Sequence, residues 1–167
     1  TVEFSVPDVS LSGSLTVEVD TRAATRHLRV VGTDVLLTVA GQVLRADVAF
    51  EQSSTATGTP VVKVAIASTA GHPLLTLTAG GANVLVVTAA TGQLLLTPTG
   101  IAGSLVVSTF ALPIPGGTTL TADELRVDVS TVRAPVTETF VLGTTSTVLT
   151  LPAGPYVSVR VVGGVGG

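Results

Sequence analysis

The chain has 167 residues, which suffices for one domain of ordinary size or for part of a repeat array. With 46% hydrophobic and only 11% charged residues it is too apolar for intrinsic disorder, and its glycines lack the three-residue period of collagen. A net charge of −3 with one lysine, Lys63, provides no basic stripe for nucleic acid, and the lack of cysteine excludes disulfides and zinc–thiolate sites.

Short runs rich in Val and Thr recur along the chain, and such β-branched residues favour strands over helices. In chain order, strands are expected at residues 15–19, 35–39, 44–50, 61–66, 74–78, 84–88, 94–97, 105–108, 125–129, 148–151 and 157–162. Turn-forming residues between the runs predict breaks at 32–34, 40–42, 80–83, 91–93 and 114–117. No apolar stripe has helical spacing, and no apolar run reaches the roughly 18 residues of a membrane helix. The expected fold is all-β, with at least eight short strands.

Two kinds of strand are expected from the apolar pattern. Residues 15–20 and 125–129 alternate, which places their polar groups on one face of a sheet. Residues 84–87 and 94–96 are apolar throughout and are expected to be covered on both faces. Because aromatic residues make up only 3% of the chain, a thin β-solenoid or β-roll-like stack is favoured over the alternative, a Greek-key β-sandwich.

An internal repeat is the strongest pattern in the chain. Residues 4–7 return at 110–113, residues 14–21 at 124–131, and residues 28–32 at 159–163, always in the same order. The offset between copies grows along the chain, so the second copy contains extra residues, chiefly at 134–156. The repeat predicts a first, partly truncated unit at 1–109 and the start of a second at 110–167. One continuous all-β domain, with convergent strand composition, is the alternative.

Four segments carry a family resemblance: residues 35–52, 92–103, 136–143 and 151–163, the last reading LPAGPYVSVRVVG. They resemble the repeats of giant bacterial surface proteins described as β-strand-repeat proteins. The resemblance implies an extracellular or cell-surface array, such as an adhesin or matrix filament, with no active site. Some such proteins accompany calcium-binding RTX segments, but the glycine-rich residues 163–167 lack the acidic residue of that motif, so a calcium roll is not expected.

The histidines and charged residues give no pattern of a catalytic site. His27 lies close in sequence to Arg22, Arg26 and Arg29, which predicts a solvated basic turn, and His72 lies in a turn-like segment. Neither accompanies a nucleophile motif, and Lys63 is not part of a phosphate-binding loop. No catalytic, cofactor-binding or metal-binding residue is therefore expected, and no cofactor.

Carboxylates, threonines and the single tyrosine are each expected to be structural. The acidic residues fit a solvated sheet face, although a weak calcium site there stays open; they are Glu18, Asp20, Asp123, Glu124 and Asp128. Thr-x-Thr triplets at 76–78, 97–99 and 137–139 resemble ice-binding ladders, but their irregular spacing favours ordinary sheet surface. Tyr156 follows a Pro-Ala-Gly-Pro segment and is expected to anchor that turn.

These observations predict a non-enzymatic structural repeat of an extracellular bacterial filament, matrix or adhesin protein. Its expected partners are neighbouring repeat units or identical subunits, contacted end to end through residues 1–20 and 157–167. A soluble monomer whose termini pair in one closed sheet is the alternative. Nucleic-acid binding and a transmembrane position are not expected. The alternative functions are a carbohydrate-binding module that uses Tyr156 and a lipid-carrying groove lined by residues 74–77, 84–87 and 94–96.

Overall fold

The computed structural model describes residues 2–6, 9–22, 27–39, 42–54, 58–79, 81–114 and 118–163. These ranges contain strands and no helix, which confirms the all-β class. The strands are β1 (Val2–Val6), β2 (Val9–Asp20), β3 (His27–Val39), β4 (Gln42–Ser54), β5 (Pro60–Ser68), β6 (Leu75–Ala79), β7 (Ala82–Thr97), β8 (Gly100–Ile114), β9 (Thr118–Ala122), β10 (Glu124–Ser130), β11 (Val136–Leu142), β12 (Thr145–Leu151) and β13 (Tyr156–Val162).

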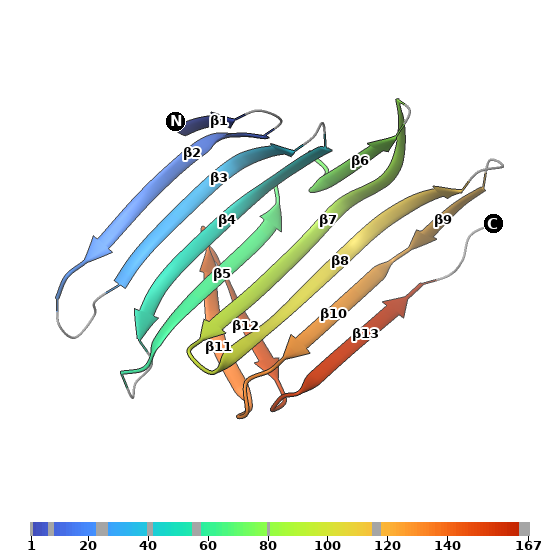
Figure 1. The fold of residues 1–167 in the computed structure, drawn as a ribbon. Helices are drawn as coiled ribbons and strands as arrows, with labels where there is room; N and C mark the ends of the chain where they lie inside the picture. Colours follow the sequence, from blue (N-terminus) through green and yellow to red (C-terminus); the bar gives the residue numbers. More distant parts are fainter. Residues whose placement is uncertain are drawn as a thin grey trace.

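One large antiparallel sheet dominates the molecule (Figure 1). Its strands follow the order β1-β2-β3-β4-β5-β7-β8-β10-β13, so the chain meanders from one edge to the other. The sheet is neither a closed barrel nor a clear solenoid. Because it stays open, it has two opposite edges: β1 with the part of β2 beyond Gly13 forms one, and β13 with β9 forms the other.

At two places in the sheet, two shorter strands lie end to end beside a longer strand. Both β5 and β6 lie between β4 and β7, one pairing with each half of these longer strands. In the same way, β9 pairs with the end of β8 and β10 with its middle. A loop at 69–74 separates β5 from β6, and Arg45 N and Val87 O hydrogen-bond to the backbone of Leu74 at 2.8 Å each. These splits keep the long strands paired along most of their length.

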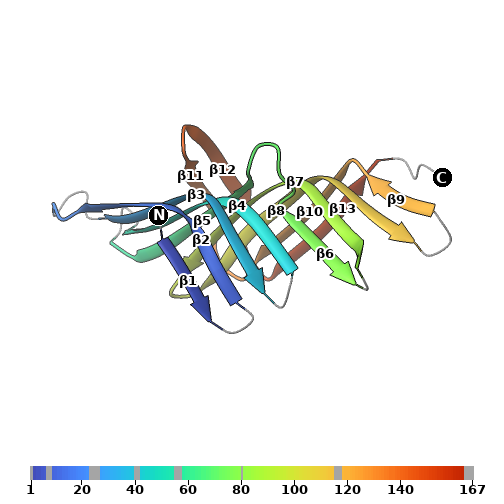
Figure 2. The same ribbon diagram turned by 90° about the horizontal axis from the view of Figure 1, so that it is seen from above.

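A separate hairpin, β11–β12, packs on one face of the large sheet (Figure 2). It falls within residues 134–156, the segment that the internal repeat predicts to be extra in the second copy. Phe140 and Leu149 are almost fully buried and belong to one core cluster with residues of the sheet. Several sheet residues beneath the hairpin are alanines, whose small side chains allow the two layers to approach closely; they are Ala49, Ala65 and Ala102.

Two predicted turns lie inside strands. Residues 91–93 do not break the chain, because β7 continues from Ala82 to Thr97. A Cβ added to Gly92 would lie only 2.8 Å from Ile66 Cγ2, so this glycine serves close side-chain packing. Residues 32–34 form an irregularity within β3, where Asp34 has a φ of 54°.

Other predictions of local structure have mixed outcomes. The turn at 80–83 is confirmed by the pairing of Ala79 with Ala82, whereas residues 40–41 and 115–117 lie outside the described residues. The expectation of at least eight short strands is confirmed, although the central strands β7 and β8 are long, with 16 and 15 residues. Residues of β1, β9 and β11 were not among the expected strands.

Two of the three segment pairs matched by the repeat form neighbouring strands in both copies, although their places in the sheet differ. In the first copy β2 pairs with β3, and in the second β10 pairs with β13. The registers differ by two residues, since Val17 lies opposite Val30 whereas Val127 lies opposite Val159. β8 spans positions 109 and 110, and the sheet continues through it. The division into two repeat units therefore stays a prediction about the sequence.

Candidate functional site

The large sheet has two faces of opposite character. Because side chains alternate across a strand, the pairing registers place the charged residues of β2–β5, β10 and β13 on the face that carries the hairpin. Asp34, in the irregularity of β3, reaches the same face through its hydrogen bonds with Arg45 and Asp47. We call this the polar face. The opposite face, called the apolar face, is lined by Leu15, Val17, Val19, Leu28, Val30, Val48, Phe50, Val62, Val64, Ile66, Leu94, Leu96, Ile101, Leu105, Leu125, Val127, Val129, Val157, Val159 and Val161.

The apolar face is exposed over much of its extent. One end of this face is closed by the sheet's own side chains, because Ala46, Val87 and Val107 are buried in a cluster that also packs against Val48, Ile66 and Leu125. Over the rest of the face, no second hairpin of the described residues packs as β11–β12 packs over the polar face (Figure 2). Nine of its residues are 36% to 72% exposed, namely Val17, Val19, Phe50, Leu96, Ile101, Leu105, Val157, Val159 and Val161. An exposed apolar surface of this extent is typical of an interaction site.

A shallow hollow lies near the middle of the apolar face. It has a volume of about 350 Å³ and is lined almost wholly by apolar groups. Gly92 and Gly103 lie among its lining residues, and their lack of side chains deepens the surface between Leu94 and Leu105. Hydrocarbon groups of a ligand or of a protein partner suit such a hollow.

Of the two segments expected to be covered on both faces, residues 94–96 are covered on one face only. Leu95 is buried beneath the hairpin, whereas Leu96, on the other face, is 36% exposed. Farther along the same strand, Leu85 and Val87 face Leu77 and Leu75 of β6 and belong to a second, smaller cluster. The prediction of two-sided cover is thus wrong for residues 94–96.

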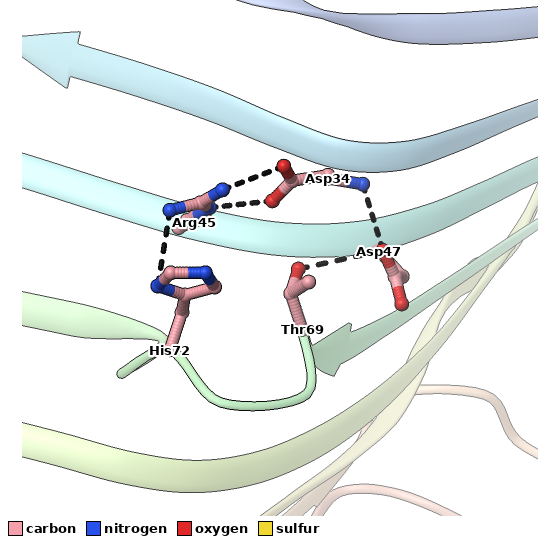
Figure 3. A network of polar contacts seen from close by, with 5 residues as sticks. All are labelled: Asp34, Arg45, Asp47, Thr69 and His72. Carbon is pink, nitrogen blue, oxygen red and sulfur yellow. Dashed lines mark hydrogen bonds and ion pairs between the residues drawn. The ribbon is translucent and has the colours of Figure 1, made fainter.

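A polar network connects β3, β4 and the loop at 69–74 on the polar face (Figure 3). Arg45 donates two hydrogen bonds to the Asp34 carboxylate, from Nε at 2.5 Å and from Nη2 at 2.6 Å. The Asp34 backbone N–H donates to Asp47 Oδ1 at 2.8 Å, and the Thr69 hydroxyl donates to the same oxygen at 3.4 Å. Arg45 Nη1 lies 3.0 Å from His72 Nδ1, which must accept because a guanidinium has only donors.

This network is suited to holding the backbone rather than to catalysis. Hydrogen bonding to Arg45 lowers the pKa of Asp34 below its ordinary value, and the same contact raises the pKa of Arg45. Both groups are therefore held in their charged forms, with no proton to exchange near neutral pH. The two carboxylates fix the irregular backbone at Asp34, and Arg45 connects this point to the loop that carries His72.

Three side chains of the sheet attach the hairpin. Lys63 Nζ lies 2.8 Å from Glu138 Oε2 and donates to the Thr139 carbonyl at 3.1 Å. Arg29 Nη2 donates to the Val141 carbonyl at 3.2 Å. Gln93 Nε2 donates to the Thr147 hydroxyl at 2.6 Å. Arg29 thus reaches the hairpin from within β3, and the prediction that it belongs to a solvated basic turn is wrong.

The carboxylates of β10 do not form the fully solvated face that was expected. Asp128 is only 8% exposed, beside the buried Ser104 and Ser130 on the covered side of the sheet, and it accepts two hydrogen bonds from Arg126 Nε at 3.0 and 3.1 Å. The prediction failed because the β11–β12 hairpin covers part of the polar face. Asp123 is exposed, and Glu124 is partly buried.

The remaining candidate residues are dispersed. His27 lines a hollow of about 340 Å³ at one end of β2 and β3, far along the strands from the His72 network. Tyr156 is half-buried and packs against the cluster beneath the hairpin. Thr76, Thr97 and Thr137 lie on different strands, and Thr97 Oγ1 donates to the Gly100 carbonyl in a turn. Arg26 and the glycines 164–167 lie outside the described residues.

Across the described ranges, no group of three or more acidic, histidine or cysteine side chains is placed to hold a metal ion. Nor does any helix in the described part of the chain have the length and apolar character needed to cross a membrane. Compared with known proteins, the chain matches no family model, no curated protein and no solved structure.

The apolar face was not identified from the sequence, although its signal was present. The alternating segments 15–20, 125–129 and 157–162 lie on three strands and contribute their apolar residues to the same face. An alternating strand ordinarily buries its apolar side inside its own domain. The pattern therefore identifies residues that share a face, whereas their exposure depends on where the hairpin packs.

Proposed function

We propose that the chain is a non-enzymatic structural module whose open sheet is continued at both edges by neighbouring repeat units or identical subunits. The observation that carries the proposal is the open sheet itself, with β1 and β13 at its opposite edges. An edge strand presents a row of backbone groups that can pair with another strand. β13 is seven residues long and contains one charged residue, Arg160, so little in its side chains opposes such pairing.

Assembly at the edges agrees with the expectation that residues 1–20 and 157–167 contact adjoining units. These ranges contain β1, β2 and β13, so they include both edges of the sheet. Successive units would pair their sheets edge to edge. We propose a solenoid-like array for this assembly of several units, and not for the fold of a single chain. The resemblance to β-strand-repeat proteins supports an extracellular bacterial filament, matrix or adhesin as the setting.

Cysteine cross-linking tests the proposal, because the natural chain contains no cysteine. A double variant, Ser5→Cys with Ser158→Cys, places one thiol on each edge strand. With a short bismaleimide linker, edge-to-edge pairing is expected to give a ladder of covalent oligomers on a denaturing gel. Arg160→Cys in place of Ser158→Cys repeats the test in a second register.

The matched control keeps Ser5→Cys and moves the second thiol to Thr150, an exposed position on the hairpin. This control is expected to give no ladder beyond random cross-linking. If neither edge pair gives more ladder than the control at any concentration, the edge-assembly proposal is wrong.

Lipid binding is the second candidate, and the hollow in the apolar face favours it. Of the residues expected to line a lipid groove, Leu94 lines this hollow, whereas Leu75, Leu85 and Val87 belong to a buried cluster farther along the strands. Acyl chains retained through purification and detected by mass spectrometry would support this function. A carbohydrate site at Tyr156 is less well supported, because the ring packs against the core instead of presenting a free stacking face.

A further inference from the structure

The apolar face provides enough surface for a stable protein interface. Its nine most exposed residues offer on the order of 800 Å² of accessible surface, about what each partner contributes to an interface of standard size. The largest apolar patch of an ordinary monomer covers roughly 300–600 Å². The summed exposed surface of these nine residues, which lie on strands from β2 to β13, exceeds what a single patch of a monomer ordinarily leaves in water.

The chemistry of the face suits an identical surface. In the eight strands that form it, the registers place no charged side chain on this side, so two copies can meet without burying an unpaired charge. Its Val, Leu and Ile side chains are those that fill the space between the two sheets of a β-sandwich, which pack about 10 Å apart. A two-fold interface uses one patch twice and so requires this self-complementarity.

We propose that the apolar face binds the apolar face of a second copy of the chain, forming a two-fold sheet-on-sheet dimer. The two hairpins then lie on the outer sides of the pair, since each packs on the opposite face of its own sheet (Figure 2). This contact is independent of edge pairing, because it uses side chains of one face instead of the backbone groups of β1 and β13.

A lipid layer is a poorer occupant of this face. Surfaces that contact bilayers are commonly flanked by tryptophan and tyrosine at the interface with water. The single tyrosine, Tyr156, packs on the hairpin side, and the chain contains no tryptophan. The hollow of about 350 Å³ is also open and shallow, unlike a cavity that encloses an acyl chain.

Sedimentation velocity of the 167-residue chain in detergent-free buffer tests the dimer. The wild-type chain is expected to show a species of twice its 16.6 kDa mass as its smallest associated form, with larger species where the edges also pair. Val17→Lys places a charge on the apolar face at a position that is 61% exposed in the monomer, so folding tolerates it. We expect it to raise the dimer dissociation constant by at least about 100-fold, because the interface would bury an unpaired ammonium. Leu105→Lys repeats the test nearer the centre of the face.

Val148→Lys is the matched control, with the same substitution at a position that is 58% exposed on the outer side of the hairpin. It should leave the dissociation constant within about threefold of the wild-type value. The proposal is overturned if the wild-type chain is a monomer, if the control and Val17→Lys weaken association equally, or if the chain is monomeric with acyl chains bound. If the cysteine variants give no cross-linked ladder while the chain still forms the dimer, edge pairing is wrong and the face-to-face dimer stands.

Discussion

At the scale of single residues, Asp34 combines an ion-paired charge with an unusual backbone conformation. Its φ of 54° lies in the left-handed region, where Asn is among the best tolerated residues. Asp34→Asn therefore removes the charge with little change to the backbone. Because Arg45 holds the pKa of Asp34 below its unfolded value, the ionised carboxylate stabilises the folded chain above about pH 4.

This stabilisation is lost as the pH falls through the lowered pKa of Asp34. We expect the wild-type chain to have a higher urea midpoint than Asp34→Asn at pH 5, with the difference shrinking steadily as the pH falls below the ordinary pKa of an aspartate. Arg45→Gln should remove the same pH dependence, because it removes the group that lowers the pKa. A difference between wild type and Asp34→Asn that stays constant across this range would contradict the assignment.

Asp34 and Gly92 also show where local sequence rules fail. Both lie in segments that read as turns, yet both lie inside long strands. Asp34 adopts the conformation typical of a turn, but Arg45 and Asp47 hold it within the sheet. Gly92 avoids a clash with Ile66 across the strand pair. Such contacts join residues distant in sequence, so a local pattern cannot distinguish a turn from a bulge or a close approach.

At the scale of elements, the β11–β12 hairpin depends on the sheet beneath it. A two-stranded hairpin alone is marginally stable in water, and this one is attached by buried side chains and a few polar contacts. Phe140 is 2% exposed in the centre of this contact. We expect Phe140→Ala to lower the free energy of unfolding by about 3–5 kcal/mol, measured by urea denaturation.

The control for Phe140→Ala is Val148→Ala, on the outer side of the same hairpin. It should change the free energy of unfolding by no more than about 0.5 kcal/mol. Equal effects of the two substitutions would mean that the hairpin is not held through its buried side. The burial of Asp128 follows from the same docking, which no pattern within β10 predicts.

The strands themselves were largely predictable, whereas their arrangement was not. Runs such as 61–66 and 125–129 are strands because Val-rich segments favour extended backbone wherever they pair. Whether the pairs form a solenoid, a sandwich or a single meander depends on contacts between strands that share no sequence signal. The residues that attach the hairpin, Lys63 and Arg29, were correspondingly assigned no role in packing.

At the scale of the whole molecule, the sheet confines its charged side chains to the face that also holds the main core beneath the hairpin. Its polar face is stabilised by the hairpin, the ion pairs and the network around Asp34, whereas the apolar face leaves Val17 and Val159 largely exposed. Exposed hydrocarbon is unfavourable in water, so a second apolar surface lowers the free energy of the sheet as a whole. The edge strands add a different means of association, through backbone hydrogen bonds.

Face-to-face and edge-to-edge association are expected to differ in their heat-capacity change. Face-to-face pairing buries roughly 1,600 Å² of mostly apolar surface, which predicts a heat-capacity change of association near −0.5 to −0.7 kcal/mol/K. Edge pairing buries mainly polar backbone, whose contribution has the opposite sign. Dilution calorimetry at several temperatures measures this quantity, and Val17→Lys should abolish the heat signal at concentrations where Val148→Lys retains it.

Because the face lacks charge, the dissociation constant should also change little between low and moderate sodium chloride. A small or positive heat-capacity change with strong salt dependence would instead assign the association to surfaces other than the apolar face.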